Sequence, residues 1–224
     1  GAGAGVLVGS AGADIMDGGD GANTAHYAAS SAGVTVDVGA QTASGGDAEG
    51  DSLSGIRNVT GSRFADSLPG DGAGNILIGG QGDDALGGGA GNDLLIGGVG
   101  ADMLAGGDGI DTADYSSSAT GVGIDLGAGT AAGGAAAGDV LTDMENLVGS
   151  NYDDTLAGGA GDNVLAGGAG ADILDGGAGI NTADYSASGS AVTVDLTTGP
   201  GAGGDAAGDL LSNFQRLVGS NYND

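Results

Sequence analysis

Residues 61–114 read as six consecutive nonapeptides: GSRFADSLP, GDGAGNILI, GGQGDDALG, GGAGNDLLI, GGVGADMLA and GGDGIDTAD. Each nonapeptide begins with Gly and has Asp or Asn at its sixth position. The eighth position is Leu in all of them except the last, where it is Ala. A fixed period that joins a glycine-rich polar half to a short apolar half is typical of stacked repeat proteins, or solenoids.

The two halves of a nonapeptide favour different local structures. Glycine destabilises a helix by about 1 kcal/mol per position and accepts positive φ, so we expect the first six residues to turn. We expect the last three residues to form a short strand with one inward side chain. Two nonapeptides then make one coil, and successive coils stack about 4.8 Å apart as neighbouring strands.

Stacking at this period places the sixth-position residues in two columns. One column holds Asp66, Asp84 and Asp102, and the other holds Asn75, Asp93 and Asp111. Carboxylates at this spacing repel one another unless a cation lies between them. Carboxylates and the main-chain carbonyls of a glycine turn together form an oxygen cage that suits a hard divalent cation.

Three of the nonapeptides, GGQGDDALG (79–87), GGAGNDLLI (88–96) and GGVGADMLA (97–105), resemble the glycine- and aspartate-rich repeat of the RTX, or hemolysin-type calcium-binding, family. The resemblance implies an all-β fold, a parallel β-roll or β-helix solenoid with Ca²⁺ bound between stacked turns. It implies ligands of two kinds, sixth-position side chains and loop carbonyls. It also implies export by type I secretion as an unfolded chain that folds outside the cell.

The resemblance carries over to every nonapeptide with Asp or Asn at its sixth position. The expected side-chain ligands of Ca²⁺ are Asp14, Asn23, Asp66, Asn75, Asp84, Asp93, Asp102, Asp111, Asp154, Asn163, Asp172, Asn181 and Asp224. The expected carbonyl ligands are those of Gly80, Gly82, Gly89, Gly91, Gly98, Gly100, Gly107, Gly109, Gly168 and Gly170. Sites with Asn are expected to be weaker, because an amide carries no charge. Weaker candidates, each in a Gly-Asp-x-Leu string, are Asp51, Asp139 and Asp209.

Longer units of equal length alternate with the nonapeptides. Nonapeptides fill residues 1–26, 61–114 and 149–184, a further one starts at 219–224, and the longer units are 27–60, 115–148 and 185–218. Val34, Val36 and Val38 alternate as in a half-buried strand, and we expect each longer unit to form wider β-helical coils of about two turns. The blocks 61–114 and 149–184 differ by one whole coil, which keeps every turn on its own edge and favours one continuous solenoid.

The composition excludes several classes of function. The chain has 224 residues, of which 55 are Gly, and a net charge of −27 with only 3 Lys and Arg. Nucleic-acid binding needs a basic surface, so we expect no nucleic acid partner. There is no Cys for a disulfide, thiol or zinc site, and no apolar run long enough for membrane insertion. Without Ca²⁺, the high charge and the 3% aromatic content predict disorder.

Other chemistry has little support in the sequence, and we expect no catalytic residue and no organic cofactor. His26 is the only His, so neither a zinc site nor catalysis by His is expected. A pair of glycosidase carboxylates would need a cleft and an acid of raised pKa, and no aromatic-lined groove is evident. Tyr27, Tyr115 and Tyr185 stand just after nonapeptide blocks, where we interpret them as aromatic filler rather than as a ligand platform.

The sequence therefore predicts a secreted, non-catalytic segment that Ca²⁺ folds, part of a larger bacterial surface, matrix, S-layer, adhesin or filament protein. End-to-end self-association is expected, because an uncapped solenoid end is a template for stacking. The alternative is the carboxyl-terminal carrier of a type I-secreted protease, lipase or epimerase, which an upstream catalytic domain would identify. An ice-binding solenoid would need regularly spaced outward Thr, whereas the outward positions here mix Ala, Asp, Ile and Gly.

Overall fold

The computed structural model describes residues 3–197 and 200–224. The chain forms two compact units, Gly1–Asp111 and Thr112–Asp224. In the described residues both units consist of strands, turns and short 3-10 helices, without an α-helix. The same residues hold no helix that is long and apolar enough to cross a membrane.

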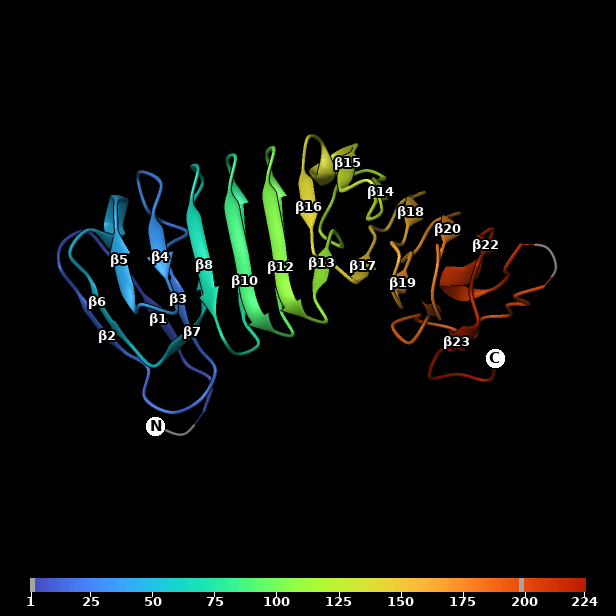
Figure 1. Ribbon diagram of the computed structural model, residues 1–224, viewed down its shortest axis with the longest axis horizontal. Helices are drawn as coiled ribbons and strands as arrows, with labels where there is room; N and C mark the ends of the chain where they lie inside the picture. Colours follow the sequence, from blue (N-terminus) through green and yellow to red (C-terminus); the bar gives the residue numbers. More distant parts are fainter. Residues whose placement is uncertain (1–2, 198–199) are drawn as a thin grey trace. The chain divides into compact units, whose positions relative to one another are not determined.

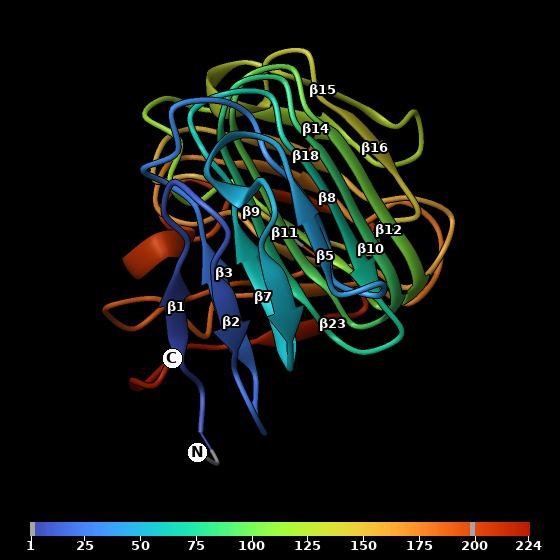
Figure 2. The ribbon, with the colours of Figure 1, turned by 90° about the vertical axis from the view of Figure 1, so that its left-hand side faces the viewer.

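Unit 1 is built of two sheets, and most of its strands alternate between them along the chain (Figures 1 and 2). Its strands are β1 (Val6–Val8), β2 (Ile15–Asp17), β3 (Asn23–His26), β4 (Thr35–Asp37), β5 (Thr42–Ser44), β6 (Ser52–Ser54), β7 (Ile56–Thr60), β8 (Ser67–Asp71), β9 (Ile76–Gln81), β10 (Ala85–Gly91), β11 (Leu94–Val99) and β12 (Met103–Gly109). One sheet has the order β1-β3-β7-β9-β11 and the other β2-β6-β5-β4-β8-β10-β12. Figure 2 shows β1, β3 and β7 in one layer and β8, β10 and β12 in the other.

Unit 2 repeats this plan. Its strands are β13 (Thr112–Asp114), β14 (Gly123–Asp125), β15 (Thr130–Ala132), β16 (Val140–Thr142), β17 (Asn146–Val148), β18 (Thr155–Ala157), β19 (Val164–Ala166), β20 (Ile173–Asp175), β21 (Thr182–Asp184), β22 (Leu210–Ser212) and β23 (Arg216–Val218). One sheet has the order β13-β17-β19-β21-β23, and the other has β16-β15-β14-β18-β20-β22.

The core is a ladder of eighth-position side chains. Strands one coil apart pair in parallel, so Leu86 lies between Leu68 and Leu104, and Leu95 lies beside Leu77. These five leucines are at most 2% exposed. Leu147, Leu156, Leu165 and Leu174 form the corresponding ladders in unit 2. The predicted all-β parallel solenoid is therefore confirmed, with a ladder of buried leucines in its core.

The longer units depart from the expected wider coils of two turns. In residues 27–60, β4 pairs with β5 and β5 with β6, both antiparallel, while β4 and β6 pair in parallel with the strands on either side. Only β7 enters the other sheet, between β3 and β9. The chain reverses direction at Gln41, with φ 53°, and at Gly45 and Gly46, with φ 77° and 50°. Residues 115–148 form the same meander of β14, β15 and β16.

Candidate metal centre

The sixth-position side chains form hydrogen-bonded columns along the stack. The main-chain N–H of Asp66 donates to Asp84 Oδ1 at 2.8 Å, and that of Asp84 donates to Asp102 Oδ1 at 2.9 Å. In the second column the N–H of Asn75 donates to Asp93 Oδ1 at 2.7 Å, and that of Asp93 to Asp111 Oδ1 at 2.8 Å. Each carboxylate is thereby fixed by the coil that precedes it.

The columns continue through the longer units. Asp14 N–H donates to Asp51 Oδ1 at 2.8 Å, and Asp172 N–H donates to Asp209 Oδ1 at 2.9 Å. A longer unit also donates to the nonapeptide that follows it: Val34 N–H donates to Asp66 Oδ1 at 2.7 Å. The Gly-Asp-x-Leu strings of these units therefore supply the same acceptor as a nonapeptide.

The second carboxylate oxygen differs from turn to turn. The Oδ2 atoms of Asp84, Asp93 and Asp172 are buried and have no hydrogen-bond partner in the described structure, and these residues are at most 2% exposed. In each of these turns the second residue is Gly at positive φ, 120° at Gly80, 99° at Gly89 and 95° at Gly168. A buried polar atom without a partner costs free energy, more so when it carries charge.

Oxygens of consecutive coils converge beside the first glycine of such a turn. The point at which a Cβ of Gly79 would stand lies 2.2 Å from Asp84 Oδ2 and 2.6 Å from the carbonyl oxygen of Gly97. The corresponding point beside Gly88 lies 2.2 Å from Asp93 Oδ2 and 2.6 Å from the carbonyl oxygen of Gly106. Only glycine leaves this space open. A carboxylate and carbonyls around an open space are the donor set of a hard cation such as Ca²⁺.

The predicted carbonyl ligands face the next coil. The carbonyl oxygens of Gly80 and Gly89 lie 2.1 Å from the points at which Cβ atoms of Gly98 and Gly107 would stand. The described residues hold no group of three or more His, Cys, Asp or Glu side chains placed to bind a metal. A cation in these turns would therefore be held by main-chain carbonyls together with carboxylates.

Burial perturbs the acids of the columns. The pKa of Asp84 is raised to about 7, chiefly by desolvation and also by the neighbouring carboxylates of Asp102 and Asp66, against the main-chain N–H of Asp66, which lowers it. Desolvation likewise raises the pKa of Asp172 to about 7, and it raises the pKa of Asp93. The fold thus holds carboxylates where negative charge is unfavourable unless a positive charge accompanies it.

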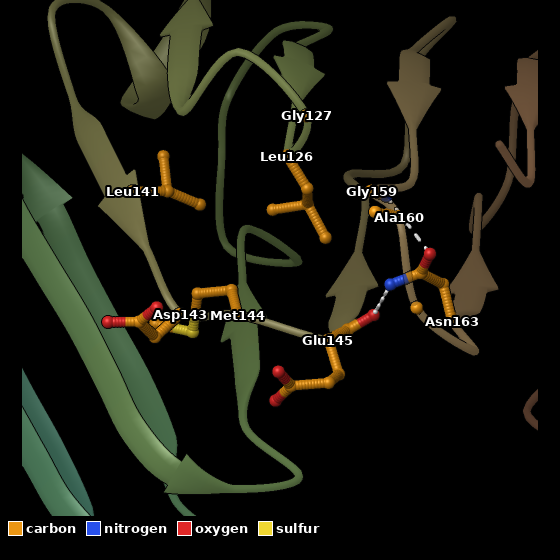
Figure 3. Close-up of a pocket in the computed structure, with 10 residues that line it drawn as sticks. Leu126, Gly127, Leu141, Asp143, Met144, Glu145, Gly159, Ala160 and Asn163 are labelled. Atoms are coloured by element: carbon orange, nitrogen blue, oxygen red, sulfur yellow. Dashed lines mark hydrogen bonds between the residues drawn. The ribbon is translucent and has the colours of Figure 1, made fainter. Parts of the chain in front are cut away.

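Turns with Asn at the sixth position satisfy both ends of the amide. Asn163 Oδ1 accepts the N–H of Gly159 at 3.0 Å, and its Nδ2 donates to the carbonyl of Glu145 at 2.6 Å. Figure 3 shows both bonds beside a cavity of about 270 Å³. Asn75 makes the same pair of bonds, from Asp71 N–H at 2.9 Å and to the carbonyl of Arg57 at 2.7 Å.

Buried tyrosines complete the carboxylates of the longer units. Tyr27 donates to Asp51 Oδ2 at 2.8 Å, Tyr115 to Asp139 Oδ2 at 2.8 Å and Tyr185 to Asp209 Oδ2 at 2.7 Å. The three tyrosines are at most 2% exposed. Their interpretation as aromatic filler missed this role, although the constant spacing of 24 residues between Tyr and Asp is visible in the sequence.

Replacing Tyr185 by Phe tests the weight of this hydrogen bond. The substitution keeps the ring but leaves a buried carboxylate oxygen of Asp209 without its donor, so we expect a loss of about 1.5–3 kcal/mol. The measurement is the urea midpoint at saturating Ca²⁺. Tyr152→Phe is the control, because the Tyr152 side chain is 49% exposed. Equal midpoints for the two variants would show that the Tyr185 hydroxyl contributes nothing.

Fold and turns together define a parallel β-roll of acidic, glycine-rich nonapeptides. The family model described as the RTX calcium-binding nonapeptide repeat, in four copies, matches residues 1–29, 78–113 and 148–183. This match confirms the predicted resemblance to the RTX calcium-binding repeat family over these residues. No curated protein matches the chain. The matched stretches include Asp84, Asp93 and Asp172, whose second oxygens have no donor.

Proposed function

We propose that this calcium-binding repeat segment is folded by Ca²⁺ outside the cell and serves as a structural part of a larger bacterial surface, matrix, S-layer, adhesin or filament protein. The observation that carries the proposal is the set of buried, donorless oxygens on Asp84, Asp93 and Asp172. The match to a family of calcium-binding repeats supports the choice of ion. The repeat itself is structural, and the segment is proposed to have no catalytic role.

In this proposal, bound calcium supplies part of the folding free energy that a hydrophobic core usually supplies. Most strands offer a single buried apolar side chain to the core, whereas the chain carries a net charge of −27. Without a cation, stacked carboxylates repel one another and oppose folding. A cation bound only by the folded state adds its binding free energy to stability. Extracellular calcium modules commonly bind at about 0.1–1 mM, which would restrict folding to the outside of the cell.

Removal of calcium is the direct test. In EDTA, far-UV circular dichroism is expected to show a disordered chain, and added Ca²⁺ is expected to produce a cooperative rise of β signal. Mg²⁺ at the same concentration is the control, because it demands a tighter octahedral geometry. Full β signal in EDTA would overturn the proposal. Light scattering in the same titration reports on the proposed end-to-end association, and a particle that stays monomeric would remove that part.

A further inference from the structure

We propose that the second residue of each nonapeptide that carries a sixth-position Asp decides whether its turn takes a cation: glycine opens the turn, and serine closes it with its own hydrogen-bond donors. This inference rests on the proposed calcium function and deepens it. It narrows the ligands from every sixth-position Asp or Asn to those in glycine turns.

Serine turns supply two donors to the carboxylate. Ser62 N–H donates to Asp66 Oδ2 at 2.5 Å, and Ser62 Oγ donates to Asp66 Oδ1 at 2.9 Å. Ser150 makes the same bonds to Asp154, at 2.6 and 2.8 Å. In both turns the carboxylate is buried, at 4% and 2% exposure, yet each of its oxygens has a donor. Such a carboxylate does not need a cation to compensate its burial.

The residue at the fourth position holds the serine in place. Main-chain N–H groups of Phe64 and Tyr152 donate to the Oγ atoms of Ser62 and Ser150, at 3.0 and 3.1 Å. Ordinary glycine turns have Gly at this position, for example Gly82 with φ 109°. The serine and the aromatic residue thus form one structural device, repeated with Ser220 and Tyr222, whose N–H donates to Ser220 Oγ at 3.0 Å.

Glycine turns lack the serine hydrogen-bond donors but keep the open space beside the first glycine of the turn. Positive φ at Gly80, Gly89 and Gly168 accompanies an Oδ2 without a hydrogen-bond partner on Asp84, Asp93 and Asp172, respectively. Gly98 and Gly107, the second residues of the turns of Asp102 and Asp111, have the same backbone conformation, with φ 108° and 104°.

The space itself is the same in both classes. Beside Gly61 of a serine turn, the Cβ point lies 2.3 Å from Asp66 Oδ2 and 2.6 Å from the carbonyl oxygen of Gly79. Beside Gly79 of a glycine turn, the corresponding distances to Asp84 Oδ2 and the Gly97 carbonyl oxygen are 2.2 and 2.6 Å. The two turns therefore place these oxygens alike but differ at the second residue, where Gly80 has φ 120° and Ser62 has no positive φ. Because glycine accepts both conformations, Ser62→Gly removes the serine donors and also allows the backbone of a glycine turn.

Amide and phenol donors act alike elsewhere in the chain. Each sixth-position Asn donates its Nδ2 to a carbonyl of a neighbouring coil, as Asn75 does to Arg57 and Asn163 to Glu145. Tyr27 and Tyr185 donate to Asp51 and Asp209. In these turns an amide or hydroxyl hydrogen already takes the place that a cation would occupy. We therefore assign them to the turns that bind no cation.

The test counts calcium ions per chain by equilibrium dialysis, at an ionic strength that suppresses loose binding to the acidic surface. Ser62→Gly is expected to bind one more Ca²⁺ than the unaltered chain, and Ser150→Gly is the independent repeat in unit 2. Asp84→Asn is expected to lose one ion. Asp66→Asn, one coil earlier in the same column, is the matched control and is expected to keep the original count.

The outcomes separate this inference from the function on which it rests. An unaltered chain that binds no Ca²⁺ overturns both. An unaltered chain that binds Ca²⁺ while Asp66→Asn and Asp84→Asn lose equal numbers of ions overturns the inference alone. The inference alone is also overturned if Ser62→Gly and Ser150→Gly both fold, as checked by circular dichroism, and bind the same number of Ca²⁺ ions as the unaltered chain. A gain of ions in either serine variant cannot result from unfolding, and it supports the inference even if Asp84→Asn fails to fold.

Discussion

Replacing Gly98 by Ala is expected to abolish the calcium-induced β signal of unit 1 or to shift its midpoint to much higher Ca²⁺. Gly98 has φ 108°, and a Cβ there would stand 2.1 Å from the carbonyl oxygen of Gly80. A left-handed backbone costs a non-glycine residue about 1–2 kcal/mol, and a contact this short forces neighbouring coils apart. We expect a total loss on the order of 3 kcal/mol or more.

Gly87→Ala is the matched control for Gly98→Ala. Gly87 belongs to strand β10, and a Cβ there would meet nothing within 4 Å. Alanine at this position should leave the calcium titration unchanged or slightly improve it, because it restricts the unfolded chain. Circular dichroism during a Ca²⁺ titration measures both variants. A similar response of the two would mean that close approach of the coils at the turn is not required.

Replacing Leu95 by Ala is expected to destabilise unit 1 by about 2–5 kcal/mol, the range for a fully buried leucine. Leu95 is 0% exposed and lies beside Leu77 in the neighbouring strand. Leu95 is the one buried apolar side chain of its strand, so few neighbouring groups can close the cavity left behind. The measurement is the urea midpoint at saturating Ca²⁺, which keeps the ions bound and isolates the contribution of the apolar ladder.

Ile76→Ala controls for the loss of apolar volume alone. Ile76 is in strand β9 beside Leu77, but its side chain is 42% exposed. Its truncation should change the free energy of unfolding by less than about 0.5 kcal/mol, and the urea midpoint should move correspondingly little. If Leu95→Ala and Ile76→Ala proved equally stable, the leucine ladder would not be the core of the coil.

The regular part of the fold could be predicted from the sequence because one period governs it. The constant place of Asp84 and Leu86 in their nonapeptide fixes which side chain turns inward and which lies in a column. The longer units carry no such period. Their antiparallel meander depends on a reversal at Gln41, which takes φ 53° although its residue type does not demand it. The sequence pattern therefore gives no sign of this reversal.

The ligand set was the less predictable part of the candidate site. Periodicity gives the position of a carboxylate but not the donors around it, so Asp66 and Asp84 look equivalent in the sequence. Their difference arises from Ser62 and Gly80, four residues earlier in each turn. The bond from Tyr27 to Asp51 joins residues 24 positions apart, one just after β3 and the other just before β6. Neither contact follows from propensity, although both recur often enough to be found by comparing the repeats with one another.

The columns of hydrogen bonds have a direction, since the sixth-position N–H donates to an acceptor further along the chain, 18 residues away between nonapeptides and 37 residues away at Asp51 and Asp209. A polypeptide that leaves a pore carboxyl end first would bring each new donor to an acceptor that is already in place. One that leaves amino end first would always expose a donor still waiting for its acceptor. The direction of these hydrogen bonds therefore favours folding from the carboxyl end. Each folded coil would then oppose return of the chain into the pore.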